Sequence, residues 1–184
     1  MKKGFSLMLA LLLLLSGWLC PSAFADAAED LRASLAQAAE GLDEANRCVQ
    51  PLMVYCAPRY QDAGKEGGSN LRRGLSAEQI ATDTSGRTYG LYVKITPRAQ
   101  KETLIISRVD ILIRDKNEEL VYAEGFNCEI VCRPGNYFHW DFYKLGGLFD
   151  NLKTLYGDIA NGNYTMSIFF DRHWAGNTTF YIYK

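Results

Sequence analysis

The feature that most constrains the fold is the C-terminal stretch, residues 164–184, where two short runs are rich in aromatic and β-branched residues. Such runs favour β-strands, and Trp174–Asn177 between them has the composition of a turn. The stretch therefore predicts a β-hairpin. A hairpin this apolar is not stable alone in water, so strands from upstream must cover it.

Upstream segments supply these strands. Alternating apolar residues predict them at 88–95, 104–113, 119–132 and 137–143, with turns at 115–118 and 134–135. In the second strand one side is expected to carry Ile105, Val109, Ile111 and Ile113. Between the last of these strands and the hairpin, Leu148, Leu152 and Leu155 predict one face of a short helix. Six strands with little helix between them predict a mainly β protein, an antiparallel sandwich over residues 88–184.

The strand 137–143 separates two kinds of side chain, because neighbours in a strand point to opposite faces. One face is expected in the core, with Trp140 buried, and comprises Phe138, Trp140 and Phe142. The other face is expected to be exposed and comprises Tyr137, His139, Asp141 and Tyr143.

The segment Gly162–Ile168, preceded by Leu155 and the predicted helix, resembles the tyrosine corner of bacterial immunoglobulin-like and fibronectin type III modules. The resemblance covers residues 88–184, and Trp140 is similar to the buried core tryptophan of those modules. It implies an immunoglobulin-like β-sandwich with Tyr164 buried, and it implies no activity. Met166 stands where antibody-type domains place a cysteine, so the inter-sheet disulfide of that family is not expected.

Residues 1–25 have the pattern of a signal peptide. Lys2 and Lys3 are followed by an apolar run at 9–15 and by the small-residue pattern of residues 23–25. The run is shorter than the ~20 residues of a spanning helix, so we expect export and no stable membrane span. Cleavage after Ala25 would give a secreted or periplasmic bacterial protein. A retained anchor and a lipoprotein modified at Cys20 are less favoured, because Gly17 and Pro21 break the run and no small residue precedes Cys20.

The mature chain is predicted to begin with a helix over 26–47. Its expected packing stripe is Leu31, Leu35, Ala38, Leu42 and Ala45. The segment 26–60 combines this helix with a cysteine-containing part that includes a short edge strand at 52–55. A polar loop follows at 61–87, and Ser76 is expected to cap one helical turn there.

Four cysteines of the mature chain predict two disulfides in an exported protein: Cys48, Cys56, Cys128 and Cys132. In an extended strand, Cys128 and Cys132 would lie ~13 Å apart at ~3.3 Å per residue. A disulfide tolerates at most about 7 Å between Cα atoms. Each would then pair with Cys48 or Cys56, unless the chain bends at 129–131.

The net charge and the aromatic residues limit the classes of partner that this chain is expected to bind. Without Lys2 and Lys3 the chain has 20 − 2 = 18 basic and 21 acidic residues, a net charge of −3, which argues against nucleic acid. The exposed face of 137–143, extended by Tyr181 and Tyr183 if the last strand lies nearby, is typical of a surface that binds a protein or glycan. The alternative is that Tyr181 and Tyr183 only cover the outer face of an edge strand. We therefore expect a non-enzymatic binding module at the cell envelope.

An enzyme with a site near His139 and Asp141 is the second hypothesis. The pair shares one strand face, but a catalytic zinc ion needs three protein ligands. The remaining histidine, His173, belongs to the expected hairpin turn. No catalytic residue, metal or cofactor is assigned from the sequence.

Overall fold

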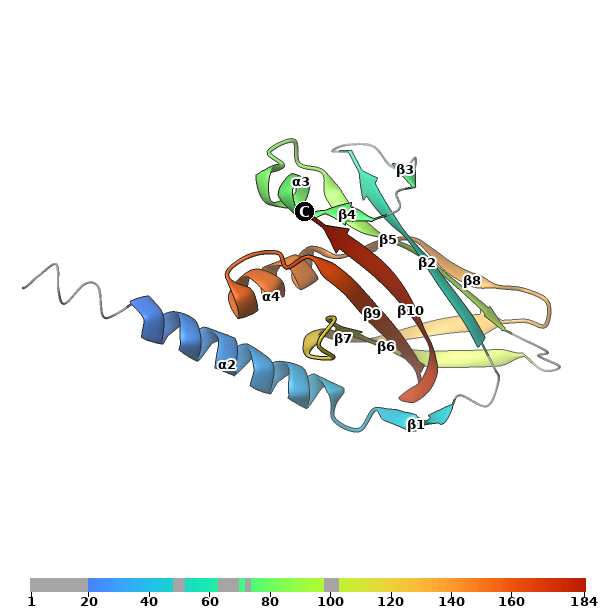
Figure 1. Cartoon of the computed structure of the whole chain (residues 1–184). Coiled ribbons are helices and arrows are strands. Elements are labelled where there is room, and N and C mark those ends of the chain that lie inside the picture. Colours follow the sequence, from blue (N-terminus) through green and yellow to red (C-terminus); the bar gives the residue numbers. More distant parts are fainter. Residues whose placement is uncertain (1–19, 48–51, 63–69, 72–73, 98–102) are drawn as a thin grey trace, which may run out of the picture.

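In the computed structural model, which describes residues 20–47, 52–62, 70–71, 74–97 and 103–184, two β-sheets pack face to face (Figure 1). Three helices accompany them in the described part of the chain: α2 (Cys20–Ala39), α3 (Ala77–Thr82) and α4 (Gly146–Tyr156). The predicted mainly β sandwich with an N-terminal helix is confirmed.

The larger sheet, sheet A, has the strand order β1-β10-β9-β6-β7, and β4 also pairs with β10. Its strands are β1 (Asp43–Arg47), β4 (Leu75–Ser76), β6 (Leu104–Arg114), β7 (Leu120–Cys132), β9 (Gly162–Phe170) and β10 (His173–Tyr183). The long strands pair antiparallel, whereas the short β1 and β4 add to β10 in parallel. The predicted C-terminal hairpin is therefore β9 and β10, in the centre of this sheet.

The smaller sheet, sheet B, has the order β3-β2-β5-β8. Its strands are β2 (Leu52–Gln61), β3 (Asn70–Leu71), β5 (Thr88–Pro97) and β8 (Phe138–Lys144). The predicted edge strand at 52–55 is only the start of β2, which pairs with β5 along its whole length. β3 pairs with β2 at Arg59 and Tyr60.

The core fills the space between the sheets. Fully buried side chains from both inner faces are Leu91, Val93 and Ile95 of sheet B and Ile106, Val109, Ile111, Ile113, Tyr164, Met166, Ile168 and Ile182 of sheet A. Ile106 takes the core position that the sequence assigns to Ile105, which is exposed. A register shift between Ile106 and Arg108 changes which residues of β6 point inward, so this part of the prediction is wrong.

The turn of the final hairpin lies earlier than the sequence indicates. It is formed by Asp171 and Arg172, whose φ angles of 49° and 70° are those of a tight two-residue hairpin turn. The carboxylate of Asp171 accepts hydrogen bonds from the backbone N–H groups of Ser107 and Arg108, which ties the turn to β6. Trp174–Asn177 is part of β10, where the pairing is irregular, so the predicted turn there is wrong.

The N-terminal helix ends sooner than its apolar pattern predicts. α2 stops at Ala39, Gly41 follows with a φ of 74°, and Asp43–Arg47 is strand β1, so the predicted helix over 26–47 is too long. Its buried or half-buried stripe is Ala28, Leu31 and Leu35, while Ala38 is exposed. The stripe packs α2 against β7 and α4. Figure 1 shows the N-terminal end of the helix projecting from the body. Signal-peptide cleavage after Ala25 stays a prediction, because residues 1–19 lie outside the described part of the chain.

Helix α4 and the strand after it contain the predicted tyrosine corner. Leu148, Leu152 and Leu155 are all buried, as their spacing predicts. Beyond the helix, the buried Tyr164 donates a hydrogen bond of 2.6 Å from its hydroxyl to the backbone oxygen of Ala160. Burial raises the pKa of Tyr164 to about 12, so the hydroxyl keeps its proton in neutral solution.

The described part of the predicted polar loop at 61–87 contains β4 and α3. Ser76 caps α3 by accepting a hydrogen bond of 3.3 Å from the backbone N–H of Gln79, as predicted. Arg87 pairs with Asp62 at 2.8 Å, which connects the two ends of this region. Residues 63–69 and 72–73 of the predicted loop lie outside the described residues.

We expect Tyr164→Phe to lower the free energy of unfolding by about 1 kcal/mol, because it removes one hydrogen bond within the tyrosine corner. Urea unfolding followed by tryptophan fluorescence measures the change. Tyr183→Phe, at an exposed position of β10, is the matched control and should leave the unfolding midpoint unchanged. Equal stability of Tyr164→Phe and the parent would show that the corner contributes nothing.

Candidate functional site

The face that the sequence singled out is reorganised by an irregularity in β8. Leu91 of β5 lies opposite Tyr143, and Val93 lies opposite Trp140, so two steps along β5 correspond to three along β8. The extra residue lies at 141–142 and forms a β-bulge, which reverses the alternation of side chains beyond it. Tyr143 therefore points to the same side as Trp140.

Tyr143 is consequently buried, and its predicted place on the exposed face is wrong. Its ring lies 5.8 Å from that of Trp140, and its hydroxyl donates to the carboxylate of Glu124 on β7. The Tyr122 hydroxyl donates to the same carboxylate at 3.0 Å. Burial, with the Glu124 hydrogen bond, raises the pKa of Tyr143 far above its usual value. This cluster connects the edge of sheet B to the edge of sheet A.

Trp140 packs against the core, on the side of β8 that the sequence predicts, but it is half-buried and not buried as expected. Its ring packs edge-on against Phe138 of its own strand and Phe126 of β7, at centroid distances of 4.9 and 6.1 Å. Trp140 thus closes the margin between the two sheets.

For the residues that precede the bulge, the predicted exposed face is confirmed, because Tyr137 and His139 are exposed. They continue into a row of rings that crosses the outer face of sheet B. The centroid distances along the row are 5.4 Å from Tyr137 to His139, 5.9 Å from His139 to Tyr92 and 6.4 Å from Tyr92 to Tyr55. The row begins just before β8 and crosses β5 to reach β2.

Two cations lie on these rings. The Lys94 ammonium is 4.0 Å from the centroid of Tyr137, and the Arg59 guanidinium carbon is 4.6 Å from that of Tyr92. Such cation–π contacts hold flexible side chains in defined positions. Lys94 also lies opposite Tyr55 on one side and His139 on the other, so the three occupy one line across the sheet.

We call this surface the aromatic face and define it by one set of residues: Met53, Tyr55, Arg59, Tyr92, Lys94, Tyr137 and His139. Tyr55, Tyr137 and Met53 are 53%, 52% and 44% exposed, which is high for large apolar side chains. The side chain of Asp141, predicted for the same surface, lies outside the described residues.

Tyr181 and Tyr183 belong to β10 of the other sheet, and both are exposed. A groove of about 360 Å³ lies where β2 passes β10, and Tyr55 and Tyr181 both line it. Tyr181 therefore adjoins the aromatic face across the groove. Tyr183 instead lies against Gly74, next to β4.

The sequence did not identify Tyr55, Tyr92, Arg59 or Lys94 as part of the site. Tyr92 and Lys94 alternate with the buried Leu91, Val93 and Ile95, and this alternation was a usable signal for an outer face. Their position beside Tyr55 and His139 depends on the pairing of β2, β5 and β8, which one sequence does not reveal.

Cys56, Cys128 and Cys132 are free thiols in the structure, and Cys48 lies outside the described residues. Cys56 is held between the strands of the two sheets, donating to the backbone oxygen of Thr179 at 3.3 Å and accepting from the hydroxyl of Thr178 at 3.4 Å. Burial raises the pKa of all three thiols. The structure shows neither of the two predicted disulfides, which stay a prediction.

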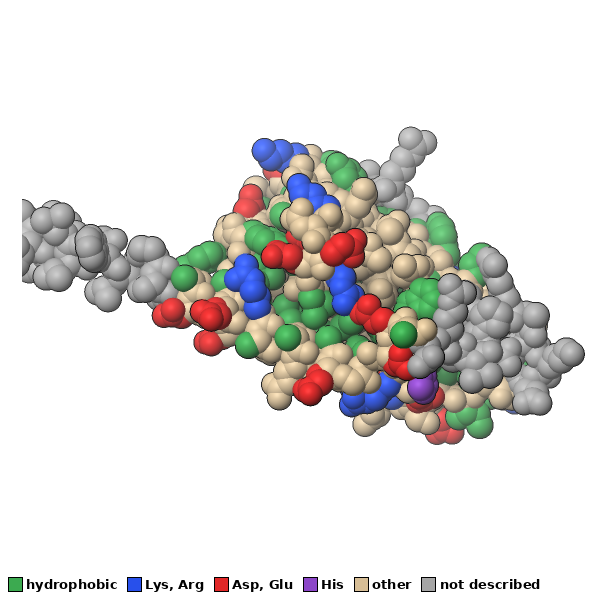
Figure 2. All heavy atoms as spheres, turned by 60° about the horizontal axis from the view of Figure 1, so that its bottom comes forward, with side chains coloured by type: hydrophobic (Ala, Val, Ile, Leu, Met, Phe, Trp, Pro, Cys, Tyr) green, Lys and Arg blue, Asp and Glu red, His purple; other side chains and the backbone are tan. Residues whose placement is uncertain are grey.

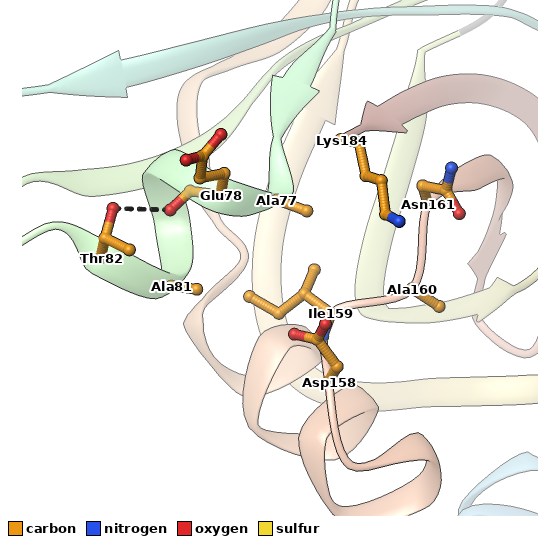
Figure 3. A pocket seen from close by; sticks show the side chains of 9 residues that line it. All are labelled: Ala77, Glu78, Ala81, Thr82, Asp158, Ile159, Ala160, Asn161 and Lys184. Atoms are coloured by element: carbon orange, nitrogen blue, oxygen red, sulfur yellow. Dashed lines mark hydrogen bonds between the residues drawn. The ribbon is translucent and has the colours of Figure 1, made fainter.

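A second hollow, of about 430 Å³, lies between α3, the loop after α4 and the end of β10 (Figure 3). Small and apolar side chains form much of its wall, and Lys184 enters it from the end of β10. Asp158 uses its carboxylate to accept the N–H of Ile159, and Thr82 donates to the backbone of Glu78. These polar groups serve the local backbone.

Within the described part of the chain, no three metal-binding side chains gather into a site that could hold an ion. The described helices also include none with the length and apolar character needed to cross a membrane.

No protein-family description matches the chain, and no curated protein is significantly similar in sequence. Among solved structures, the ApaA protein from Bordetella pertussis is 15% identical, with a TM-score of 0.36 over 73% of this chain and 98% of its own. An immunoglobulin-like protein from Pseudomonas aeruginosa is 10% identical, with a TM-score of 0.29 over 74% of this chain and 95% of its own. Neither similarity assigns a function or a family.

The bulge in β8 predicts different outcomes for two tyrosines of one segment. Tyr143→Ser should lower the free energy of unfolding by about 3 kcal/mol, because it leaves a cavity and deprives the Glu124 carboxylate of one of its two tyrosine partners. Tyr137→Ser, at an exposed position, should change it by less than about 0.5 kcal/mol. Urea unfolding of both variants measures the contrast, and equal effects would contradict the assigned register of β8.

Proposed function

We propose that this chain is an exported, non-enzymatic module that binds a protein partner at the cell envelope through the aromatic face. The observation that carries the proposal is the row of rings and cations on the outer face of sheet B, in which Tyr55, Tyr137 and His139 are exposed. Export rests on the signal-peptide pattern of residues 1–25.

The composition of the aromatic face supports a protein partner. Tyrosine, methionine and arginine are enriched where proteins meet, and tyrosine and arginine provide much of the binding energy there. Met53, Tyr55, Arg59 and Tyr137 supply these residue types on one surface. Their cation–π contacts hold Arg59 and Lys94 in place before binding, which lowers the entropy lost when the complex forms.

The geometry of the rings favours a protein over a glycan. A sugar ring stacks best on an open, flat aromatic face. Neighbouring rings in the row are tilted by 38° to 62° relative to one another, so they form no common platform. In addition, Arg59 covers one face of Tyr92, and Lys94 covers one face of Tyr137. This surface therefore offers a ligand tilted rings and cations, without a shared flat platform.

Site-specific photo-crosslinking in the native host tests the proposal. A benzophenone amino acid at position 55 should give a discrete adduct with one envelope protein, because Tyr55 lies in the aromatic face. The same group at position 177, exposed on β10 and lining a hollow of sheet A together with Glu44 and Thr165, is the control and should give none. Mass spectrometry then identifies the cross-linked protein for purification.

With the purified partner, the double variant Tyr55→Ser/Tyr137→Ser should lose about 30-fold or more in affinity, equivalent to about 2 kcal/mol. Tyr183→Ser should bind as the parent does. Unfolding curves should be unchanged, since all three side chains are exposed. Adducts from position 177 alone, or full affinity of the double variant, would refute the proposal.

A further inference from the structure

The groove between the two sheets adds a second contact region beside the aromatic face. β2 of sheet B lies alongside β10 of sheet A (Figure 1), and the groove of about 360 Å³ lies between them. Tyr55, a member of the aromatic face, lines it from β2, and Tyr181 lines it from β10. Resting on the proposed function, we infer that this groove binds a proline-rich segment of the protein partner in the polyproline II conformation.

The groove has tyrosines at its sides and small apolar residues at its bottom. Tyr55 and Tyr181 are exposed, whereas Ala57 and Pro58, which also line the groove, are buried. Proline rings are rigid and apolar, and proline-rich segments bind in grooves that are lined by aromatic side chains. The shape and composition of the groove therefore match a ligand of this kind.

The backbone at the groove disfavours the other common way of binding a peptide, which is addition of a β-strand. Pro58 of β2 has no backbone N–H, and the Thr179 oxygen of β10 accepts a hydrogen bond of 3.3 Å from the Cys56 thiol. Burial raises the pKa of this thiol, so it keeps its proton in neutral solution. Neither strand presents a full row of backbone partners, so recognition rests on side chains.

Hydrogen-bond donors also line the groove. Hydroxyl or amide groups are supplied by Tyr55, Asn163, Thr179 and Tyr181. Within the described part of the chain, no hydrogen bond uses these four side-chain groups. A polyproline II segment has no internal hydrogen bonds, so its carbonyl groups accept hydrogen bonds from donors of this kind.

The described side chains that line the groove are uncharged at neutral pH, unlike other parts of the surface. The exposed Asp26, Glu29 and Asp30 lie on α2, and Figure 2 shows acidic side chains gathered on the part of that helix that projects from the body. A segment rich in charged residues would lose hydration in the groove, and the described lining residues form no ion pair to replace it. Proline avoids this cost, and its restricted backbone loses little conformational freedom on binding.

A neutral glycan is the alternative ligand, because tyrosine rings, an amide and hydroxyl groups also contact sugars. Neighbouring sugar hydroxyl groups pair best with a planar side chain that makes two hydrogen bonds at once. Among the described residues that line the groove, only Asn163 has such a side chain. Since the bottom of the groove is apolar, a proline-rich segment fits it better than a sugar does.

Fluorescence anisotropy with three labelled probes tests the inference: capped decaproline, a glycine–serine peptide of equal length, and maltohexaose as a neutral glycan. Decaproline is expected to bind the parent chain best. Tyr181→Ser removes one side of the groove but no member of the aromatic face, so decaproline affinity should fall about tenfold or more. Tyr183→Ser, at an exposed position of the same strand beside β4, is the matched control and should bind as the parent does.

Two further variants separate the contributions of the groove. Tyr181→Phe keeps the ring and should retain most of the affinity, because the ring provides the contact with proline. Asn163→Ala should lower the affinity about threefold, because it removes one hydrogen-bond donor. Unfolding curves of all these variants should match the parent, since the three positions are exposed.

Equal binding of decaproline and the glycine–serine peptide would overturn the inference, as would decaproline affinity that Tyr181→Ser leaves unchanged. Stronger binding of maltohexaose than of decaproline would overturn it in favour of a neutral glycan. With the cross-linked partner, Tyr137→Ser tests the aromatic face alone and Tyr181→Ser tests the groove alone. Loss of affinity only with Tyr137→Ser refutes the proline-rich segment and leaves the proposed function standing, and loss only with Tyr181→Ser does the opposite. Full affinity of both variants refutes both.

Discussion

One extra residue in β8 decides which side chains this protein offers to its surroundings. Three residue steps along β8 pair with only two along β5. Tyr143 therefore points inward, where it contacts Trp140 and Glu124. Tyr137 and His139 lie before the bulge and stay outside, beside Tyr92. The bulge thus closes the margin between the sheets and ends the row of rings on the outer face of sheet B.

The fold was largely predictable from patterns that act within a few residues. The alternation of apolar and polar residues predicted the long β-strands, and the spacing of the leucines predicted α4. Ser76 caps α3 as expected. The tyrosine corner was also predictable, because its hydrogen bond joins Tyr164 to Ala160, four residues upstream. Local interactions of this kind leave a signature in the order of residues.

Several of the errors have a common physical cause, which is pairing between strands that are distant in sequence. Asp43–Arg47 continues the apolar spacing of a helix, yet it pairs with β10 and becomes β1. Tyr143 and Ile105 were placed on the wrong faces because register shifts in β8 and β6 reverse the alternation. The candidate site was half predictable: Tyr137 and His139 followed from their own strand, whereas Tyr55, Tyr92, Arg59 and Lys94 join them only through the register of sheet B.

The central claim is that the outer face of sheet B, ordered by the bulge, is the binding surface. Hydrogen–deuterium exchange of the chain with and without its cross-linked partner tests it most directly. The account predicts that binding slows exchange at backbone amides of β2, β5 and β8 and leaves β6 and β9 unchanged. Slower exchange confined to sheet A, or to the hollow beside α3, would contradict it.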